Sequence, residues 1–353
     1  HLKALQMLID SGADVNAMDD EGSTPLHQAV ASRQLECAKA LASADGIDLE
    51  ARDATLATPI SVAATNDIVP IVKLLISKKA RLDAGDERDF TPLHHACAYG
   101  YMETVQILLE AGADPNAATL IDDTTPFHQA VFNGHHELLS ILLQYKADLN
   151  AGNDKALALA CLNGHNKCVE ILLAHKADPN NTDFELSAPA HKAALNGHLE
   201  CLKLLVKSGA NLSAKDADGA TPLHKASHAG NPRVVQYILS QAADTVNERD
   251  NYQGAPIHNA AFSGHAPIVT MLLGAGARLD ITEDLGAAPL HLAALNGHLE
   301  CVKAILDGLS SKPSNLKLVL DQPDRIGMTP LMHAVSNPEM VTLLCKAGAP
   351  VNT

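Results

Sequence analysis

The stretch ATPLHKASHAGNPRVVQYILS, residues 220–240, decides the fold because it carries its own signals for starting and ending helices. Thr221 is a favoured helix N-cap, and Pro222 takes the first helical position, where its missing N–H costs nothing. Gly230 ends this short helix, and apolar residues then recur along one broad face of a second helix over 232–240. The stretch therefore predicts two short antiparallel helices.

The same pattern recurs along the chain with a period near 33 residues. Counterparts of Thr-Pro-Leu-His begin at ten positions: Thr24, Thr58, Thr91, Thr125, Lys155, Ala188, Thr221, Ala255, Ala288 and Thr329. Five are followed by Gly-His, and most are followed further on by a stretch similar to Leu-Leu-x-x-Gly-Ala-Asp-x-Asn. This combination of motif and period closely resembles the ankyrin repeat, and the resemblance covers essentially the whole chain.

The resemblance implies an all-α ankyrin-repeat solenoid of antiparallel helix pairs with projecting β-hairpin fingers, curved around a concave groove. We expect a single array over residues 1–353, with a partial repeat at 1–16, ten repeats and an insertion at 308–320. The chain starts in mid-repeat without a methionine. We therefore expect either a piece of a longer protein or a first half-repeat that the structure does not cover.

Three places depart from the repeat pattern. The repeat that begins at Thr58 has Ser61 in place of the motif histidine, so we expect its helices to be less firmly held. The repeat that begins at Lys155 follows a connection three residues short, which predicts a truncated finger at 151–154 and a bend or opening point near 147–160. The insertion is expected to emerge as a loop, either a contact element or a tolerated bulge.

Composition narrows the classes of partner. The formal charge of −15 disfavours nucleic acid and anionic membrane surfaces, and no apolar run approaches the roughly 20 residues that span a bilayer. The seven cysteines fall in helix registers that predict buried, unpaired thiols, which indicates a reducing, cytoplasmic setting. They are Cys37, Cys97, Cys161, Cys168, Cys201, Cys301 and Cys345.

The sequence offers no motif for catalysis or for a cofactor. Thirteen of the eighteen histidines fall in the Thr-Pro-Leu-His or Gly-His positions of the repeats. The family resemblance implies that the first set hydrogen-bonds neighbouring loops. His136 and Glu137 begin a zinc-like motif, but no second histidine follows four residues after His136. We therefore expect no metal site, no cofactor and no enzymatic activity.

Partners of ankyrin repeats usually lie along the concave groove, and register alone locates that groove here. Six of the ten aromatic residues fall in groove registers, and exposed aromatics are typical of binding hot spots. The candidate partner-binding residues are Phe90, Tyr99, Phe132, Phe184, Tyr252 and Phe262, with Glu87, Arg88, His228 and Leu295. For Phe184 and Tyr252, packing between adjacent fingers is an equal alternative.

Acidic residues recur beside these aromatics and would steer a partner with basic and apolar segments toward this edge, although acidic tips also serve solubility alone. Family resemblance adds hydroxylation of finger asparagines, with Asn16 as the best match and Asn150 second, against an ordinary role in turns. The function predicted is a protein-interaction scaffold or adaptor. The alternative is a regulatory domain of a larger channel or enzyme; the sequence predicts no oligomeric state.

Overall fold

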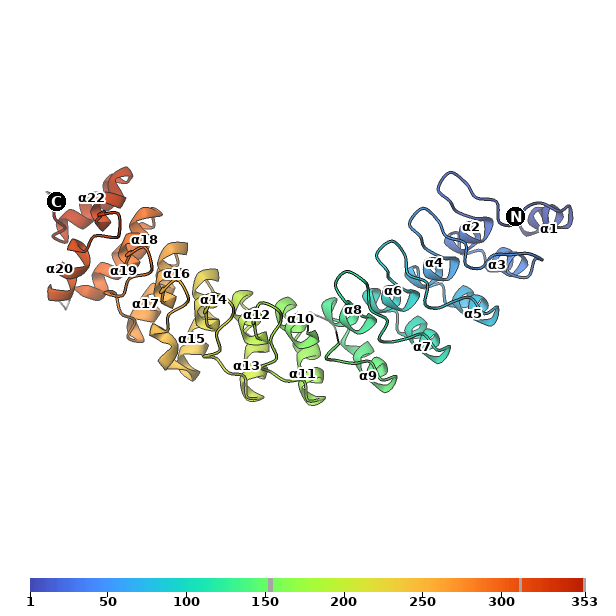
Figure 1. Ribbon diagram of the computed structural model, residues 1–353, viewed down its shortest axis with the longest axis horizontal. Helices are drawn as coiled ribbons and strands as arrows, with labels where there is room; N and C mark the ends of the chain where they lie inside the picture. Colours follow the sequence, from blue (N-terminus) through green and yellow to red (C-terminus); the bar gives the residue numbers. More distant parts are fainter. Residues whose placement is uncertain (152–154, 311–312, 352–353) are drawn as a thin grey trace. The chain divides into compact units, whose positions relative to one another are not determined.

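A computed structural model describes residues 1–151, 155–310 and 313–351, and within these ranges every regular element is helical (Figure 1). The prediction of an all-α repeat fold is confirmed. Contacts divide the chain into two units: unit 1 comprises residues 1–160 and 170–177, and unit 2 comprises residues 161–169 and 178–353. That all repeats form a single array stays a prediction.

Unit 1 consists of helix pairs in which the first helices of successive repeats form one row and the second helices another (Figure 1). The first helices are α2 (Pro25–Ala31), α4 (Pro59–Thr65), α6 (Pro92–Tyr99) and α8 (Pro126–Phe132). The second helices are α1 (Leu2–Asp10), α3 (Leu35–Leu41), α5 (Val69–Ser77), α7 (Met102–Glu110) and α9 (His136–Gln144). The helices α10 (Ala156–Asn163) and α11 (Asn166–Ala174) contribute residues to both units.

Unit 2 repeats the same arrangement. Its first helices are α12 (Pro189–Leu195), α14 (Pro222–Ala229), α16 (Pro256–Ser263), α18 (Pro289–Leu295) and α21 (Pro330–His333). Its second helices are α13 (Leu199–Lys207), α15 (Pro232–Gln241), α17 (Ala266–Gly274), α19 (Leu299–Leu309) and α22 (Pro338–Lys346). The 3-10 helices η1 (Ala243–Asn247) and η2 (Ala334–Ser336) and the helix α20 (Pro313–Asp321) complete it.

The helix boundaries follow from the signals in the sequence. Thr221 caps α14, Pro222 takes the first position, and Gly230 ends the helix in the left-handed conformation, as predicted. Leucine, isoleucine and valine side chains of both rows fill the core, each stabilising the fold by about 1.5 to 3 kcal/mol on burial. Phe127 takes the leucine slot of the Thr-Pro-Leu-His motif in its repeat and is completely buried.

The fingers between repeats are closed turns, and no strand occurs in the ranges given above. In the finger before α14, the Asp216 N–H donates to the Ala220 carbonyl at 3.0 Å. The Asp216 carboxylate accepts from the N–H groups of Asp218 and Ala220 at 3.0 and 2.9 Å. Aspartate therefore organises the turn locally, where the sequence suggested a β-hairpin.

Neighbouring fingers are joined at their tips by single backbone hydrogen bonds. In unit 1 the Ala54 N–H donates to the Glu21 carbonyl at 2.9 Å. In unit 2 the same bond recurs from Ala217 to Glu185, Asn251 to Asp218, Asp284 to Tyr252 and Arg325 to Leu285, at 2.8 to 2.9 Å. Each finger thus restrains the next one.

The insertion at 308–320 differs from the expected loop. The helix α19 continues through Gly308 and Leu309, and residues 313–321 form the additional helix α20. Val319 and Leu320 are buried, so the apolar residues of the insertion extend the core of unit 2. The prediction of a loop was wrong because these residues carry a helical apolar spacing of their own.

Six of the seven cysteines are buried and all seven are free, as predicted, but Cys345 is exposed. The helix α22 turns Met340 and Leu344 inward and leaves Cys345 on its outer side. That face is covered by no further repeat in the described part of the chain. No described helix is long and apolar enough to cross a membrane.

The shortened connection at 151–154 lies mostly outside the described residues. The division between the two units crosses α10 between Ala160 and Cys161 and crosses α11 between Val169 and Glu170. An opening point near 147–160 stays a prediction. Hydrogen exchange over 155–160 as slow as in α8 and α12 would contradict it.

Candidate interaction surfaces

The motif histidines tie each repeat to the next finger. The His224 Nδ1 atom accepts from the Thr221 N–H at 3.1 Å, and its Nε2 donates to the Gly254 carbonyl at 3.2 Å. An N–H only donates and a carbonyl only accepts, so the ring is neutral with its proton on Nε2. The same type of bond to the next finger is made by His27, His94, His191, His224, His258 and His291, which confirms the implied role.

Burial keeps these rings neutral. Loss of solvent lowers the pKa of His94, His224 and His258 to about 4. The same cause lowers the pKa of His191 and His291. The histidines therefore serve as fixed hydrogen-bonding links at neutral pH.

The Gly-His histidines hold the ends of the first helices, where the exposed aromatics lie. The His298 Nε2 atom donates to the Phe262 carbonyl at 2.9 Å, and the His135 Nε2 atom donates to the Ala98 carbonyl at 3.0 Å. Gly264 has φ +84°, and a Cβ atom there would lie 2.7 Å from Nδ1 of His298. Glycine is therefore needed so that the ring can pack against this turn and fix Phe262.

In unit 1, two aromatic side chains stand at the last positions of adjacent first helices, and we call them the unit 1 patch. Tyr99 is 55% exposed and Phe132 is 49% exposed. Tyr99 stacks on Tyr101 with ring centroids 5.6 Å apart. Tyr101 thus supports one side of the Tyr99 ring, and both Tyr99 and Phe132 remain about half exposed to solvent.

Unit 2 carries an apolar hollow between its last two fingers and α18, which we call the finger pocket. It has a volume of about 190 Å³. Its apolar wall consists of Leu285, Leu292, Leu295 and Ile326, of which Leu285, Leu295 and Ile326 are 67%, 57% and 80% exposed.

One side of the finger pocket is held by a largely buried contact between a histidine and an aspartate. The rings of His291 and His333 meet edge to face with centroids 6.1 Å apart. The His333 Nε2 atom lies 2.7 Å from Oδ2 of Asp324. The imidazole rings are thereby fixed while the leucines and isoleucine stay free to contact a partner.

Phe90, by contrast, is used within its own repeat. Its ring stacks on His94 at 5.2 Å between centroids and meets His95 edge-on at 5.7 Å. Glu87 and Arg88 are exposed at the same finger, and the Glu87 N–H donates to the Thr55 carbonyl at 2.9 Å. Only the charged tip of this finger is therefore freely accessible.

The remaining predicted residues of unit 2 are accessible. Phe184 and Tyr252 stand exposed on finger tips, and Phe262 is exposed at the end of α16. His228 is exposed, and its Nδ1 atom lies 3.0 Å from the Ser263 hydroxyl. The structure thus places Leu295 in the finger pocket and the other four at separate positions along the fingers and helix ends.

Sequence reasoning missed several exposed apolar residues. Leu120 and Ile121 are the most exposed large apolar residues of unit 1, and they stand at a finger tip. Leu292, which is half-buried, also lines the finger pocket, whereas Leu285 and Ile326 fall at finger positions that register does predict. The sequence places both residues at finger tips: Leu285 and Ile326 each stand directly before a finger glycine, at the finger position that Tyr252 holds in its own repeat.

The finger asparagines bridge successive repeats. The Asn16 side-chain amide donates to the Gly46 carbonyl at 2.8 Å and accepts from the Asp48 N–H at 2.9 Å. Asn150 is exposed, and its N–H donates to the Asp148 carboxylate at 2.8 Å. Hydroxylation of either residue stays a prediction, and an enzyme acting on Asn16 would first have to release this bridge.

Among the described residues, no group of three or more His, Cys, Asp or Glu side chains could hold a metal ion. The fold and its surfaces define a class: a repeat protein of stacked helix pairs that exposes apolar side chains along its fingers and first helices. Models of the ankyrin-repeat family match residues 51–119, 117–183 and 257–353 as three-copy repeats, and residues 1–42 and 190–239 as many-copy repeats. The chain belongs to the ankyrin-repeat family.

Several curated relatives share part of this sequence. The chain is 36% identical over 111 residues to the human neurogenic locus notch homolog protein 2, covering 31% of this chain and 4% of that protein. It is 34% identical over 117 residues to the mouse B-cell lymphoma 3 protein homolog, covering 32% and 26%. It is 31% identical over 124 residues to the human ankyrin repeat and SOCS box protein 3, covering 35% and 18%.

The matched parts thus span a quarter or less of most of these relatives. Ankyrin repeats generally mediate protein–protein interactions.

Proposed function

We propose that the chain is a protein-interaction scaffold or adaptor that binds a partner polypeptide along the side lined by finger tips and first helices, and that it has no enzymatic activity. The finger pocket carries this proposal. Leu285, Leu295 and Ile326 remain largely solvated on a framework that backbone and histidine hydrogen bonds already fix. Exposed apolar groups on a rigid support are typical of binding surfaces.

The chemistry of the partner follows from the surroundings. Glu283, Asp324 and Arg325 line the finger pocket beside the leucines, so acidic side chains outnumber the one arginine, and the whole chain carries a net charge of −15. A partner segment with apolar and basic residues would bury its apolar side chains here and be attracted over a distance by the acidic surface. The six buried free thiols support a reducing, cytoplasmic setting, and the negative charge argues against nucleic acid as the partner.

The alternative, a regulatory domain of a larger channel or enzyme, is supported by the small share of the relatives that the matched parts span. The same surface would then bind another part of the same polypeptide.

The test compares proteins captured by the wild-type chain and by two variants. The double change Leu295→Ala with Ile326→Ala removes apolar contacts from the finger pocket, and Tyr99→Ala with Phe132→Ala does so in the unit 1 patch. Each lost hot spot should weaken a direct partner by about 2 kcal/mol or more. The control is Leu318→Ala, which removes a similarly exposed leucine from α20. Capture of the same proteins at the same yield by all four chains would refute the proposal.

A further inference from the structure

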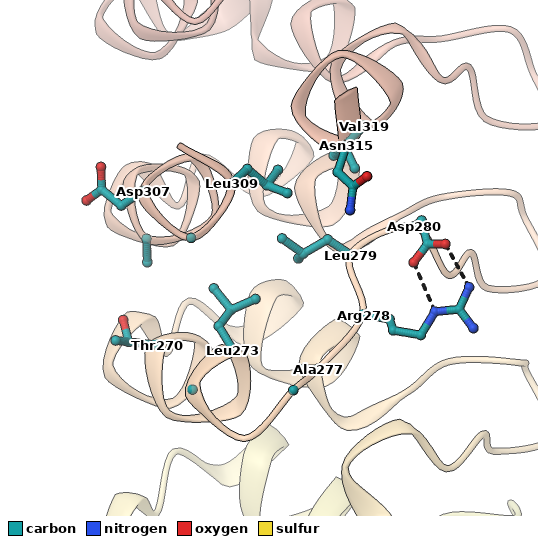
Figure 2. Close-up of a pocket in the computed structure, with 14 residues that line it drawn as sticks. Thr270, Leu273, Ala277, Arg278, Leu279, Asp280, Asp307, Leu309, Asn315 and Val319 are labelled. Atoms are coloured by element: carbon teal, nitrogen blue, oxygen red, sulfur yellow. Dashed lines mark hydrogen bonds and ion pairs between the residues drawn. The ribbon is translucent and has the colours of Figure 1, made fainter. Parts of the chain in front are cut away.

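The insertion builds a second cavity in unit 2, apart from the fingers. The helix α19 has 11 residues where α17 has 9, and α20 follows it. Between the ends of α17 and α19, the loop 276–280 and α20 lies a cavity of about 540 Å³ (Figure 2). We call it the insertion cavity; no first helix and no finger tip contributes to its lining.

The centre of the insertion cavity is apolar. Leu273, Leu279 and Leu309 point toward one another there, and Val319 of α20 closes the top in this view (Figure 2). A Cβ atom on Gly308 would lie 2.8 Å from Cδ1 of Leu273. The bare glycine therefore lets α19 approach α17 closely while the neighbouring side chains leave a hollow.

The rim of the cavity is charged unevenly. Arg278 and Asp280 stand at one end and form two hydrogen bonds, at 3.1 and 2.7 Å, so their charges offset each other (Figure 2). Asp307 stands at the other end and is exposed; within the described residues no hydrogen bond or ion pair engages its carboxylate. The carboxyl ends of α17 and α19 add negative dipole ends to this rim.

We propose that the insertion cavity binds a segment of a partner protein in which an aliphatic and a basic side chain lie close together. The aliphatic group would pack on Leu273, the least buried of the three leucines, and the cationic group would pair with Asp307. The net charge of −15 favours the approach of a basic segment, and an acidic segment would be repelled. This site is separate from the finger pocket and goes beyond the function proposed above.

Two variants remove the two parts of the site. A Cβ atom on Gly274 meets open space, so Gly274→Leu places a side chain in the cavity and also replaces a poor helix former. Asp307→Asn removes the charge alone. Ala174→Leu and Glu110→Gln are matched controls, because Ala174 and Glu110 are the ninth residues of α11 and α7, as Gly274 and Asp307 are of α17 and α19.

The probe is a capped, fluorescein-labelled peptide of leucine and lysine, with a leucine and glutamate peptide as counterpart, and binding to the full chain is followed by anisotropy. We expect Asp307→Asn to weaken binding of the lysine peptide about twofold to fivefold and Gly274→Leu about tenfold or more. The two controls and Phe262→Ala should bind as the wild type does. The glutamate peptide should not bind.

Equal binding by all variants would mean attraction to the acidic surface in general and would overturn the proposal. Absence of binding to the wild type at about 1 mM peptide would do the same. Because Asp307→Asn changes only an exposed side chain, its result holds even if Gly274→Leu disturbs folding. Loss of binding on Phe262→Ala, with Asp307→Asn unaffected, would assign the peptide to the fingers instead.

Discussion

The repeats that begin at Thr58 and at Thr221 have the same helices but are tied to their neighbours differently. In the repeat at Thr221, the buried ring of His224 donates a hydrogen bond to the Gly254 carbonyl of the next finger. In the repeat at Thr58, Ser61 occupies the position of the motif histidine. Its hydroxyl lies 3.0 Å from the Thr58 hydroxyl, within the cap of the same helix. The buried side chain that reaches the next finger is thus replaced by one that serves only its own repeat.

The other side-chain hydrogen bonds between neighbouring repeats are either the same near Thr58 and Thr221 or are made by different residues. Arg52 donates to the Gly85 carbonyl at 2.9 Å, as Lys215 donates to the Arg249 carbonyl at 2.8 Å. Where His265 bonds the carbonyl of His228 at 3.0 Å, the repeat after Thr58 uses Thr104, whose hydroxyl donates to Asp67 at 2.7 Å. The comparison indicates that the repeat at Thr58 lacks one specific buried link and keeps a side-chain bond at each of the other two positions.

The largest expected difference concerns that link. His224→Ala should lower the free energy of unfolding by about 3 kcal/mol, because it leaves a buried N–H and a carbonyl unpaired and opens a cavity. Ser61→Ala should cost about 1 kcal/mol or less, since only a bond within the cap is lost. Urea unfolding of both variants measures this, and equal losses would show that the histidine link is not what distinguishes the repeats.

The second expected difference concerns how the free energy of unfolding depends on pH, because His224 titrates and Ser61 does not. The pKa of His224 falls from 6.5 to about 4 on folding, so the unfolded chain binds more protons between these values. The stability from the neutral ring is complete above about pH 6.5 and is lost as the pH falls toward 4, by at most about 1.4 kcal/mol per pH unit. His224→Gln should flatten the pH dependence of unfolding by this amount. Ser61→Ala should leave the slope unchanged; a parallel curve for His224→Gln would contradict the linkage.

A smaller effect on the free energy of unfolding is expected from the hydrogen bond between Thr104 and Asp67. Thr104→Val keeps the shape of the buried side chain but removes the hydroxyl that bonds Asp67. The cost should be about 1 kcal/mol, because the exposed carboxylate regains water in exchange. If Asp67→Ala abolishes any further effect of Thr104→Val in a double-mutant cycle, the pair itself carries the energy; additive losses would disprove the link.

The smallest effect is expected at the exposed links common to both repeats. Arg52→Ala and Lys215→Ala should each change the free energy of unfolding by about 0.5 kcal/mol or less, because the side chains are solvated and lose conformational entropy when they bond. Thermal melting of the two variants should give matching shifts. A large loss for Arg52→Ala alone would mean that it replaces the missing histidine after all.

Local signals explain how much of this the sequence could predict. Thr221, Pro222 and Gly230 fix α14 within a few residues, and the recurring histidines could be assigned because each has the same neighbours in every repeat. The insertion was not assigned as a helix because it has no counterpart in the other repeats, although Val319 and Leu320 fall three and four residues after Leu316, the spacing of a helix face. The half-buried state of Phe90 depends on the rings of His94 and His95, which register alone does not place.

Register within the repeat predicted where the candidate site residues lie, but it did not predict which side chains come together in space. Register placed Tyr99, Phe132 and Leu295 correctly at helix ends, but the finger pocket depends on how Leu285, Leu292 and Ile326 converge from different repeats. Such convergence is a property of the stacked fold and leaves only weak traces in any single motif.

The backbone bonds between finger tips limit what a bound protein can recognise. In unit 2 the tip N–H groups of Asn251, Asp284 and Arg325 are already engaged with the preceding finger. Because these N–H groups are already hydrogen-bonded, an extended partner chain cannot pair with them as an added β-strand. Selectivity must then come from side chains at the tips, and partner choice can change by substitution at these positions while the scaffold stays intact.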